Sequence, residues 1–263
     1  MPERNLRVHG KAPFRVAVIH GGPGAAGEMA PVARRLAQTR GVLEPLQTAA
    51  TVAGQIAELA GTLSHHATAP AVLIGYSWGA WLSLLVAAQH PELAERLVLV
   101  SCPAFGDSGA EQLRARRLER LSHAEQAQYQ QAVAALHGPA ATGGDPMLET
   151  LGRLTGKTDA YELIEEAGGS DDVRGNAAIY RAVWKEAAEL RRSGALLRRA
   201  RTVQCPVIAI HGDADPSPAA AVAEPLSAAL ASFRLATLAR CGHTPWRERY
   251  AKEEFYRLLA EVV

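Results

Sequence analysis

Cysteine is scarce in this chain. Three cysteines, Cys102, Cys205 and Cys241, are spread over 263 residues. They are too few and too scattered for a disulfide framework, and they lack the paired spacing of a zinc site. We therefore expect reduced thiols, with no metal and no other cofactor.

Long apolar runs and an excess of charge are also missing. No apolar stretch approaches the roughly 20 residues needed to cross a bilayer, and the N-terminal MPERNLRVHG lacks the apolar segment of a signal peptide. Basic and acidic residues, 28 and 27, nearly cancel, so no overall field favours nucleic acid or an anionic membrane. These absences predict a cytoplasmic protein with a small neutral partner and no nucleic-acid or membrane partner. They leave the oligomeric state open.

Short apolar runs alternate with longer amphipathic ones from residue 14 to about residue 103. We expect strands at FRVAVIH, GVLEPL, AVLIGY and RLVLVS, and helices at MAPVARRLAQT, TVAGQIAELAGTL and WLSLLVAAQH. The alternation is typical of an α/β fold, a mostly parallel sheet with helices on both faces. The strands are apolar throughout, which indicates burial on both faces and a ligand site at their carboxyl ends.

The pattern changes after residue 103. Residues 104–190 hold helix-like runs rich in Arg, Glu, Gln and Ala, without a convincing strand. Strands resume with PVIAIHG and FRLATLA, and WRERYAKEEFYRLLAEVV predicts a terminal helix. We interpret residues 1–103 and 191–263 as one α/β core domain, and residues 104–190 as a short helical cap inserted into it.

Three local patterns lie within this insertion. SHAE matches a capping box, with Ser122 as the N-cap and Glu125 three residues later. Asp145 before Pro146 predicts a second N-cap. The run LRARRLER is interleaved with leucines, which predicts a solvated helix face rather than a nucleic-acid patch.

A serine lies between glycines where a strand-like run becomes a helix-like one. In GYSWG the glycines permit a tight turn because they lack a Cβ atom, and Ser77 at its apex faces outward. This is the G-x-S-x-G nucleophile elbow. Ordinary turns also place serine between glycines, but the strand before it and the helix after it favour a nucleophile.

A serine hydroxyl needs a base, and the base needs a group that orients it. His243, in RCGHTPW, follows the strand FRLATLA and can take the proton from Ser77. Asp215, in DADP, follows PVIAIHG and is the preferred partner for the imidazole. Asp213 and Asp107 are the alternatives, because each also follows a predicted strand.

The first long strand ends in HGGPG, where glycines let backbone N–H groups approach a substrate closely. The N–H of Gly22, or that of Gly21, is expected to join that of Trp78 in an oxyanion hole. A phosphate-binding loop is the main rival, but HGGPG lacks both the Walker lysine and the G-x-G-x-x-G spacing. In the insertion, Tyr161 and Trp184 are expected to shape the substrate pocket.

With HGGPG, GYSWG, GDADP and CGHTPW in this order, the sequence resembles the α/β-hydrolase superfamily over nearly its full length. HGGPG and the tryptophan after the serine look closest to the proline iminopeptidase branch. The resemblance implies a helical cap inserted after the strand that follows the nucleophile helix. The family pattern G-x-x-D, counted from Gly212, supports Asp215.

The sequence departs from this family in two places. The HGGPG strand begins after about a dozen residues, so the usual N-terminal antiparallel hairpin is missing or vestigial. The cap is shorter than in typical iminopeptidases, and the acidic residues that bind a substrate's N-terminal ammonium have no clear match. Asp159, Glu165 and Glu166 are candidates for that role, although a solvated helix face is the simpler explanation.

These features predict a serine hydrolase that cleaves a small ester or amide through an acyl-enzyme intermediate. A narrower alternative is a proline iminopeptidase-like aminopeptidase that acts on short peptides. An acyltransferase or perhydrolase would use the same three residues. The alternative of another class is a non-catalytic small-ligand-binding protein on a hydrolase scaffold, because fold does not determine function.

Overall fold

A seven-stranded sheet forms the centre of the molecule. The computed structural model describes residues 5–138, 141–164 and 173–263. The strand order is β1-β4-β2-β5-β6-β8-β9, and all neighbours are parallel except β1 and β4. The strands are β1 Leu6–His9, β2 Phe14–Ile19, β4 Gly41–Pro45, β5 Ala71–Tyr76, β6 Ala94–Val100, β8 Val207–Gly212 and β9 Phe233–Leu238. The expected α/β fold is confirmed.

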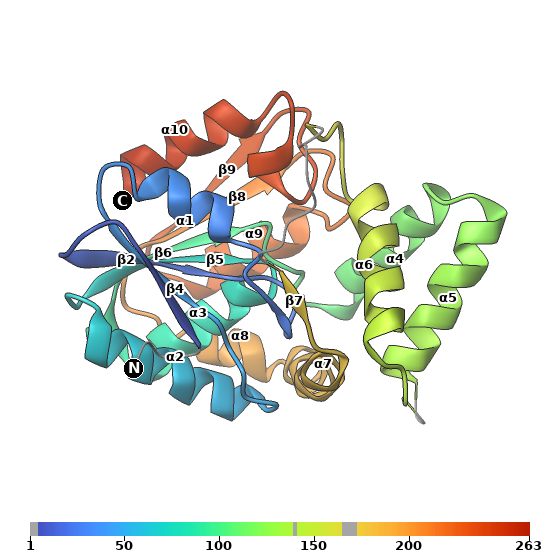
Figure 1. Ribbon diagram of the computed structural model, residues 1–263, viewed down its shortest axis with the longest axis horizontal. Coiled ribbons are helices and arrows are strands. Elements are labelled where there is room, and N and C mark those ends of the chain that lie inside the picture. Colours follow the sequence, from blue (N-terminus) through green and yellow to red (C-terminus); the bar gives the residue numbers. More distant parts are fainter. Residues whose placement is uncertain (1–4, 139–140, 165–172) are drawn as a thin grey trace.

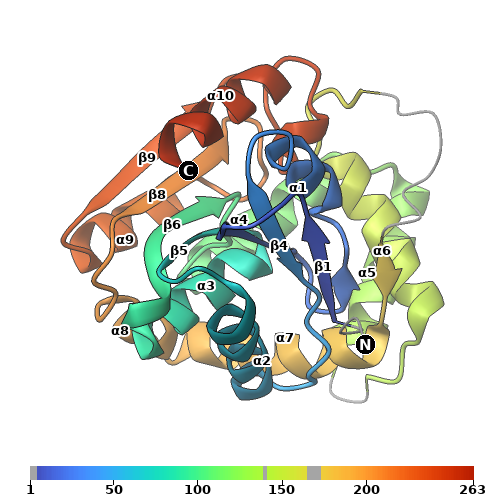
Figure 2. The same cartoon turned by 60° about the vertical axis from the view of Figure 1, so that its left-hand side comes forward.

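Helices cover both faces of the sheet (Figure 1 and Figure 2). On one face lie α1 (Ala30–Leu36) and α10 (Lys252–Val262), which share an apolar cluster. The opposite cluster is built from α2 (Val52–His66), α3 (Trp78–Gln89), α8 (Ala195–Ala200) and α9 (Ala220–Ala229). Two 3-10 turns also lie in this part of the chain: Pro91–Leu93 between α3 and β6, and Pro245–Arg247 between β9 and α10. The terminal helix begins later than the sequence pattern suggested, because the 3-10 turn precedes it.

The central strands are buried on both sides, as their continuous apolar runs predict. In β2, Val16 and Val18 join the cluster under α1 and α10, whereas Ala17 and Ile19 join the cluster under α2 and α3. Successive side chains of a strand point to opposite faces, which explains this division. Each fully buried aliphatic side chain of this size contributes about 1.5–3 kcal/mol.

Between β6 and β8 the chain forms α4 (Asp107–Glu119), α5 (His123–His137), α6 (Asp145–Thr158) and α7 (Ala177–Arg192), followed by α8. Figure 1 shows α4, α5 and α6 projecting beyond one end of the sheet, with α7 lying next to α8. A third apolar cluster joins α5, α6 and the start of α7, whereas Val183 and Ala187 of α7 belong to the core. Because α7 contributes side chains both to the core cluster and to the cluster of the insertion, the boundary of the cap at residue 190 stays a prediction.

The two predicted helix caps differ in outcome. Ser122 and Glu125 form the expected capping box, in which each side chain accepts a hydrogen bond from the other residue's backbone N–H. The prediction that Asp145 is an N-cap is wrong, because Gly144 occupies that position and Asp145 is already helical. The Asp145 carboxylate instead accepts a hydrogen bond from the Ala177 N–H, 2.7 Å away, at the start of α7.

Two short antiparallel pairings connect elements that lie far apart in the sequence. β1 contributes four residues that pair with β4 at the sheet edge. A two-residue strand in the insertion, β7 (Arg174–Gly175), pairs with β3 (Ala25–Ala26), just after HGGPG. The sequence pattern showed no strand there, because two residues are too few to display an alternation. This ribbon holds the glycine loop against the start of α7.

Close backbone contact at the start of α3 predicts opposite effects for two substitutions. In Gly79→Ala, the new Cβ would lie 2.4 Å from the Ile19 carbonyl oxygen. We expect the free energy of unfolding to fall by about 3 kcal/mol, as for an overpacked core. Gly61, inside α2, has no neighbour within 4 Å of such a Cβ. Gly61→Ala should therefore raise the free energy of unfolding by about 0.8–1 kcal/mol.

Urea unfolding followed by circular dichroism measures both effects. Equal changes in the two variants would contradict the close approach of α3 to β2.

Candidate active site

Ser77 lies in a strained turn between β5 and α3. Its φ of 48° and ψ of −117° belong to a region that non-glycine residues rarely adopt. The turn is held from two sides: the Ser77 N–H donates to the Val100 carbonyl at 2.9 Å, and a Cβ on Gly75 would lie 2.2 Å from the Gly79 oxygen. Only glycine fits at Gly75 and Gly79, which explains why the serine stands between them. Ser77 is partly exposed and lines a cavity.

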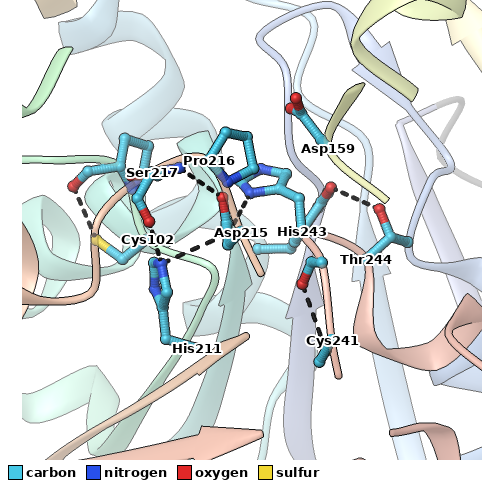
Figure 3. Close-up of polar contacts among 12 residues, drawn as sticks. Cys102, Asp159, His211, Asp215, Pro216, Ser217, Cys241, His243 and Thr244 are labelled. Atoms are coloured by element: carbon cyan, nitrogen blue, oxygen red, sulfur yellow. Dashed lines mark hydrogen bonds and ion pairs between the residues drawn. The ribbon is translucent and has the colours of Figure 1, made fainter. Parts of the chain in front are cut away.

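The loop after β9 brings His243 to Asp215, which follows β8. The His243 Nδ1 atom lies 2.7 Å from Asp215 Oδ2. Figure 3 shows the carboxylate between two imidazoles, with His211 Nε2 at 3.5 Å on its other side. The second oxygen, Oδ1, accepts a hydrogen bond from the Ser217 N–H at 2.8 Å. Asp215 is 2% exposed, so its position is fixed by these contacts.

The two alternative acids lie elsewhere. Asp213 is exposed, and its carboxylate accepts a hydrogen bond from the Cys241 N–H at 3.2 Å. Asp107 forms an ion pair with Arg191 at 3.1 Å. Neither carboxylate is the one bonded to His243, so the structure pairs the predicted base with the preferred acid.

Burial and charge act against each other in this pair. Burial alone would lower the pKa of His243, but the charge and hydrogen bond of Asp215 raise it above its ordinary value. Burial alone would raise the pKa of Asp215, but His243 lowers it below the ordinary value of an aspartate. The pair thus favours an ionised carboxylate beside an imidazole that accepts a proton readily.

The other two histidines at this edge have structural hydrogen bonds. His20 is fully buried: its Nδ1 lies 2.7 Å from the Gly21 carbonyl, and its Nε2 accepts from the Gln47 N–H at 3.2 Å. Burial lowers its pKa to about 4, so it is neutral. His211, also fully buried, has its Nε2 2.8 Å from the Ser217 carbonyl.

Ser77 and His243 open onto one cavity of about 310 Å³. Its lining also includes Gly22 and Trp184 among the predicted site residues. The remaining lining residues are Ala25, Glu28, Tyr76, Pro103, Leu113, Arg117, Leu148, Leu151, Gly152, Thr155, Gly156, Asp159, Tyr180, Ser217, Thr244 and Arg247. A larger hollow, of about 900 Å³, lies at the opposite, amino ends of the strands, far from these motifs. The smaller cavity is at the carboxyl ends, where parallel sheets bind ligands.

The glycine loop reaches the cavity at Gly22, whereas Trp78, the first residue of α3, is fully buried and is absent from the lining. Gly21 does not line the cavity: its backbone hydrogen-bonds to the Glu28 carboxylate, and the Glu28 oxygen and the Tyr76 ring pack against its Cα. Gly22 does line it. Trp78 is the first residue of α3, so its N–H precedes the intrahelical hydrogen bonds. Gly22 is therefore the better placed of the two glycines to pair with Trp78.

The two predicted cap residues differ in position. Trp184 lines the cavity, and its ring contacts those of Trp78 and Trp81, with centroids 6.0 and 5.8 Å apart. Tyr161 is 50% exposed, packs against Tyr250 and is not part of the lining. Trp184 thus joins the insertion to α3, whereas the Tyr161 ring lies outside the cavity.

Sequence reasoning missed an acidic side chain in the cavity, Glu28. Burial raises its pKa to about 7, although His243, Arg247 and the backbone of Gly21 all act to lower it. A carboxyl with this pKa changes charge near neutral pH. The only sequence signal is its position four residues after HGGPG, which does not reveal that it turns back toward the histidine.

The solvated face predicted for LRARRLER is wrong for Arg117, whereas Arg120 is exposed as predicted. Arg117 lines the cavity, and its guanidinium binds both oxygens of Asp159, with Nε 2.9 Å from Oδ1. Arg120 donates to the carbonyls of Thr158 and Ala214. The partners lie about 40 or more residues away, so helical periodicity could not indicate them. Asp159, a candidate for ammonium binding, is occupied by Arg117, and Glu165 and Glu166 lie outside the described residues.

Across residues 5–138, 141–164 and 173–263, no three His, Cys, Asp or Glu side chains gather as metal ligands. Within the same residues no helix has the length and apolarity needed to span a membrane.

Comparison with known proteins gives one family and many related folds. The profile of the alpha/beta hydrolase family matches residues 15–257. VinJ is similar in structure, with a TM-score of 0.68 and 19% identity over 97% of this chain and 93% of that one. A proline iminopeptidase of Mycobacterium smegmatis has a TM-score of 0.65 and 18% identity, covering 97% and 92% of the two chains. The enol-lactonase of Burkholderia xenovorans LB400 has a TM-score of 0.61 and 18% identity, covering 97% of this chain and 94% of that one. The curated proteins contain no match to the sequence.

The His243–Asp215 pair predicts a specific pH dependence. A base must be neutral to accept a proton, and Asp215 raises the pKa of His243. The reactivity of Ser77 should therefore fall as the pH drops, with a midpoint above about 6.5, the ordinary value for histidine. Asp215→Asn should shift this midpoint to lower pH and reduce the limiting rate about 10⁴-fold. The pH profile of reaction with an activated ester measures both, and an unshifted midpoint in the variant would contradict the pairing.

Proposed function

The chain belongs to the alpha/beta hydrolase family, and on this basis we propose that it is a serine hydrolase of small esters or amides. One observation carries the proposal. A histidine bonded to a buried aspartate and a serine in a strained elbow line the same small cavity. A purely structural role would not require all three groups at one cavity.

The reaction would follow the usual course of a serine nucleophile. Ser77 Oγ attacks the substrate carbonyl carbon while His243 Nε2 takes its proton, and Asp215 stabilises the resulting imidazolium. The carbonyl oxygen becomes negative and accepts hydrogen bonds from the N–H groups of Gly22 and Trp78. His243 then protonates the leaving group, and the acyl-enzyme forms. Water, deprotonated by His243, attacks this ester and releases the acid and Ser77.

The cavity limits what can react. About 310 Å³ is at the lower end of the size of small-molecule sites, so small substrates fit and bulky ones do not. Leu113, Leu148, Leu151 and Trp184 supply an apolar wall from the insertion. We take residues 104–190 as a cap that restricts access to the cavity. A cytoplasmic location of the protein stays a prediction.

An aminopeptidase is the second candidate, and Glu28 favours it. Of the two acidic side chains in the lining, Asp159 is bound by Arg117, whereas Glu28 forms no ion pair within the described residues, although the charge of Arg247 nearby acts on it. Glu28 is close enough to His243 for their charges to interact. A substrate ammonium bound by Glu28 would therefore lie near Ser77 and the bond to be cleaved.

Labelling with a fluorophosphonate tests for the nucleophile. We expect one adduct per chain, located at Ser77 by mass spectrometry, because the probe reacts with activated serines. Ser77→Ala should abolish labelling, and His243→Ala should slow it by at least about 10³-fold. Ser83, buried in the same helix with its hydroxyl bonded to Gly79 O, is the matched control: Ser83→Ala should label normally.

The absence of labelling in folded protein would contradict the hydrolase and favour a ligand-binding protein. If Ser77 is labelled, adding an alternative acyl acceptor such as an alcohol or hydrogen peroxide separates a hydrolase from an acyltransferase or a perhydrolase.

Recognition of an amine can be tested at Glu28. Small aminoacyl amides are compared with their N-acetylated forms, using wild type and Glu28→Gln. We expect kcat/KM for the free amines to drop about 10- to 100-fold in the variant, as for loss of one member of a partly buried charge pair. It should not change for the acetylated forms. In the wild type, activity on the free amines should rise through pH 7, where Glu28 ionises. Equal rates for free and acetylated substrates would exclude the aminopeptidase.

A further inference from the structure

We propose that Glu248 is a positioning residue for His243, which it joins to the segment 159–164 at the end of α6. The inference rests on the proposed function, because it assigns to His243 the role of base. Glu248 directly follows the 3-10 turn Pro245–Arg247 and is fully buried.

The Glu248 carboxylate binds two separate parts of the chain at once. Oε1 accepts hydrogen bonds from the N–H groups of Gly242 and Tyr161, both at 2.9 Å. Oε2 accepts one from the Glu162 N–H at 2.8 Å. A buried carboxylate is costly unless its oxygens are satisfied, and hydrogen bonds to an ionised acceptor are stronger than neutral ones. Glu248 therefore fixes the residue next to the base relative to a segment about 80 residues earlier.

Backbone contacts follow the same junction. The His243 N–H donates to the Asp159 carbonyl at 2.7 Å, and the Ile164 N–H donates to the Arg247 carbonyl at 2.8 Å. The Arg249 N–H donates to Glu162 O at 2.8 Å. The two segments are thus connected along their length, with the Glu248 carboxylate in the middle.

The junction leaves no room for adjustment at Gly242. A Cβ there would lie 2.1 Å from the Asp159 carbonyl oxygen and 2.6 Å from Glu248 Oε1. The Asp159 side chain in turn binds Arg117 of α4. The imidazole is therefore located from two directions: by Asp215 through its ring, and by Glu248 and Asp159 through its backbone. A shift of about 1 Å in a reacting group can cost about 100-fold in rate, so the second set of contacts matters for turnover.

The test compares two buried carboxylates that become amides. Glu248→Gln keeps the size of the side chain but turns an NH₂ group toward a backbone N–H that needs an acceptor. Glu44→Gln is the matched control. Glu44, on β4, is also fully buried and is absent from the cavity lining. Its Oε2 atom lies 2.7 Å from Nε2 of His9, on β1. Both variants are expected to unfold at lower temperature than the wild type, since each loses a satisfied buried carboxylate.

Only Glu248→Gln should alter the chemistry. We expect its rate of fluorophosphonate labelling at Ser77, measured well below the unfolding transition, to fall about 10- to 100-fold. The midpoint of its pH profile should also move to lower pH than in the wild type. A looser contact between His243 and Asp215 raises the pKa of His243 less than the wild-type contact does. The other charged groups that act on this histidine are Asp159, Arg117 and Glu28, and neither variant changes them. Glu44→Gln should keep the wild-type rate and pH profile.

A wild-type rate and pH profile in Glu248→Gln would overturn the inference, and so would equal losses of rate in both variants. If Glu248→Gln does not fold, Glu248→Asp takes its place, because it keeps the charge but shortens the reach, and the same results are expected. Failure of the proposed function is distinguishable, since the wild type itself would then not be labelled.

Discussion

The approach of α3 to the sheet is the constraint on which the rest of the site depends. At Gly75 and Gly79 the backbone of the elbow lies closer to its neighbours than any side chain would allow. That proximity places Ser77 in a conformation that non-glycine residues avoid, and the bond from Ser77 N–H to β6 holds it there. Stability from the apolar clusters on both faces of the sheet offsets this local strain. The other groups of the site arrive at the same edge because parallel strands all end there.

The same geometry explains what the sequence could predict. Ser77, Asp215 and His243 each follow a strand whose apolar pattern is plain, and parallel strands bring their carboxyl ends together, so an aspartate after β8 was expected to meet His243. The preference for Asp215 over Asp213 also depended on the G-x-x-D pattern of the family that the sequence resembles. The sheet, its covering helices and the capping box at Ser122 were likewise predictable, since they depend on local periodicity. The roles of these residues in catalysis stay predictions until chemistry is measured.

Residues that act through distant partners were not predictable. Arg117 looked like part of a solvated helix because its partner, Asp159, is 42 residues away and on another element. Glu248 lies in the run predicted as the terminal helix, but it precedes α10 and is buried against the backbone N–H groups of Tyr161 and Glu162. Asp145 resembled a cap for its own helix, yet it serves the start of α7. In each case a polar side chain found its partner across the fold, where neither spacing nor composition carries information.

The short ribbon between β3 and β7 has a consequence for engineering. It binds the loop that follows HGGPG to the start of α7, and the Asn176 N–H donates to the Gly24 carbonyl at 2.8 Å beside it. The insertion is therefore not an interchangeable module. A chimaera that exchanged residues 104–190 for the equivalent part of a relative would replace one side of this ribbon, and with it the support of the glycine loop. Altering selectivity by grafting would then require the loop and the graft to be chosen together, as one unit of design.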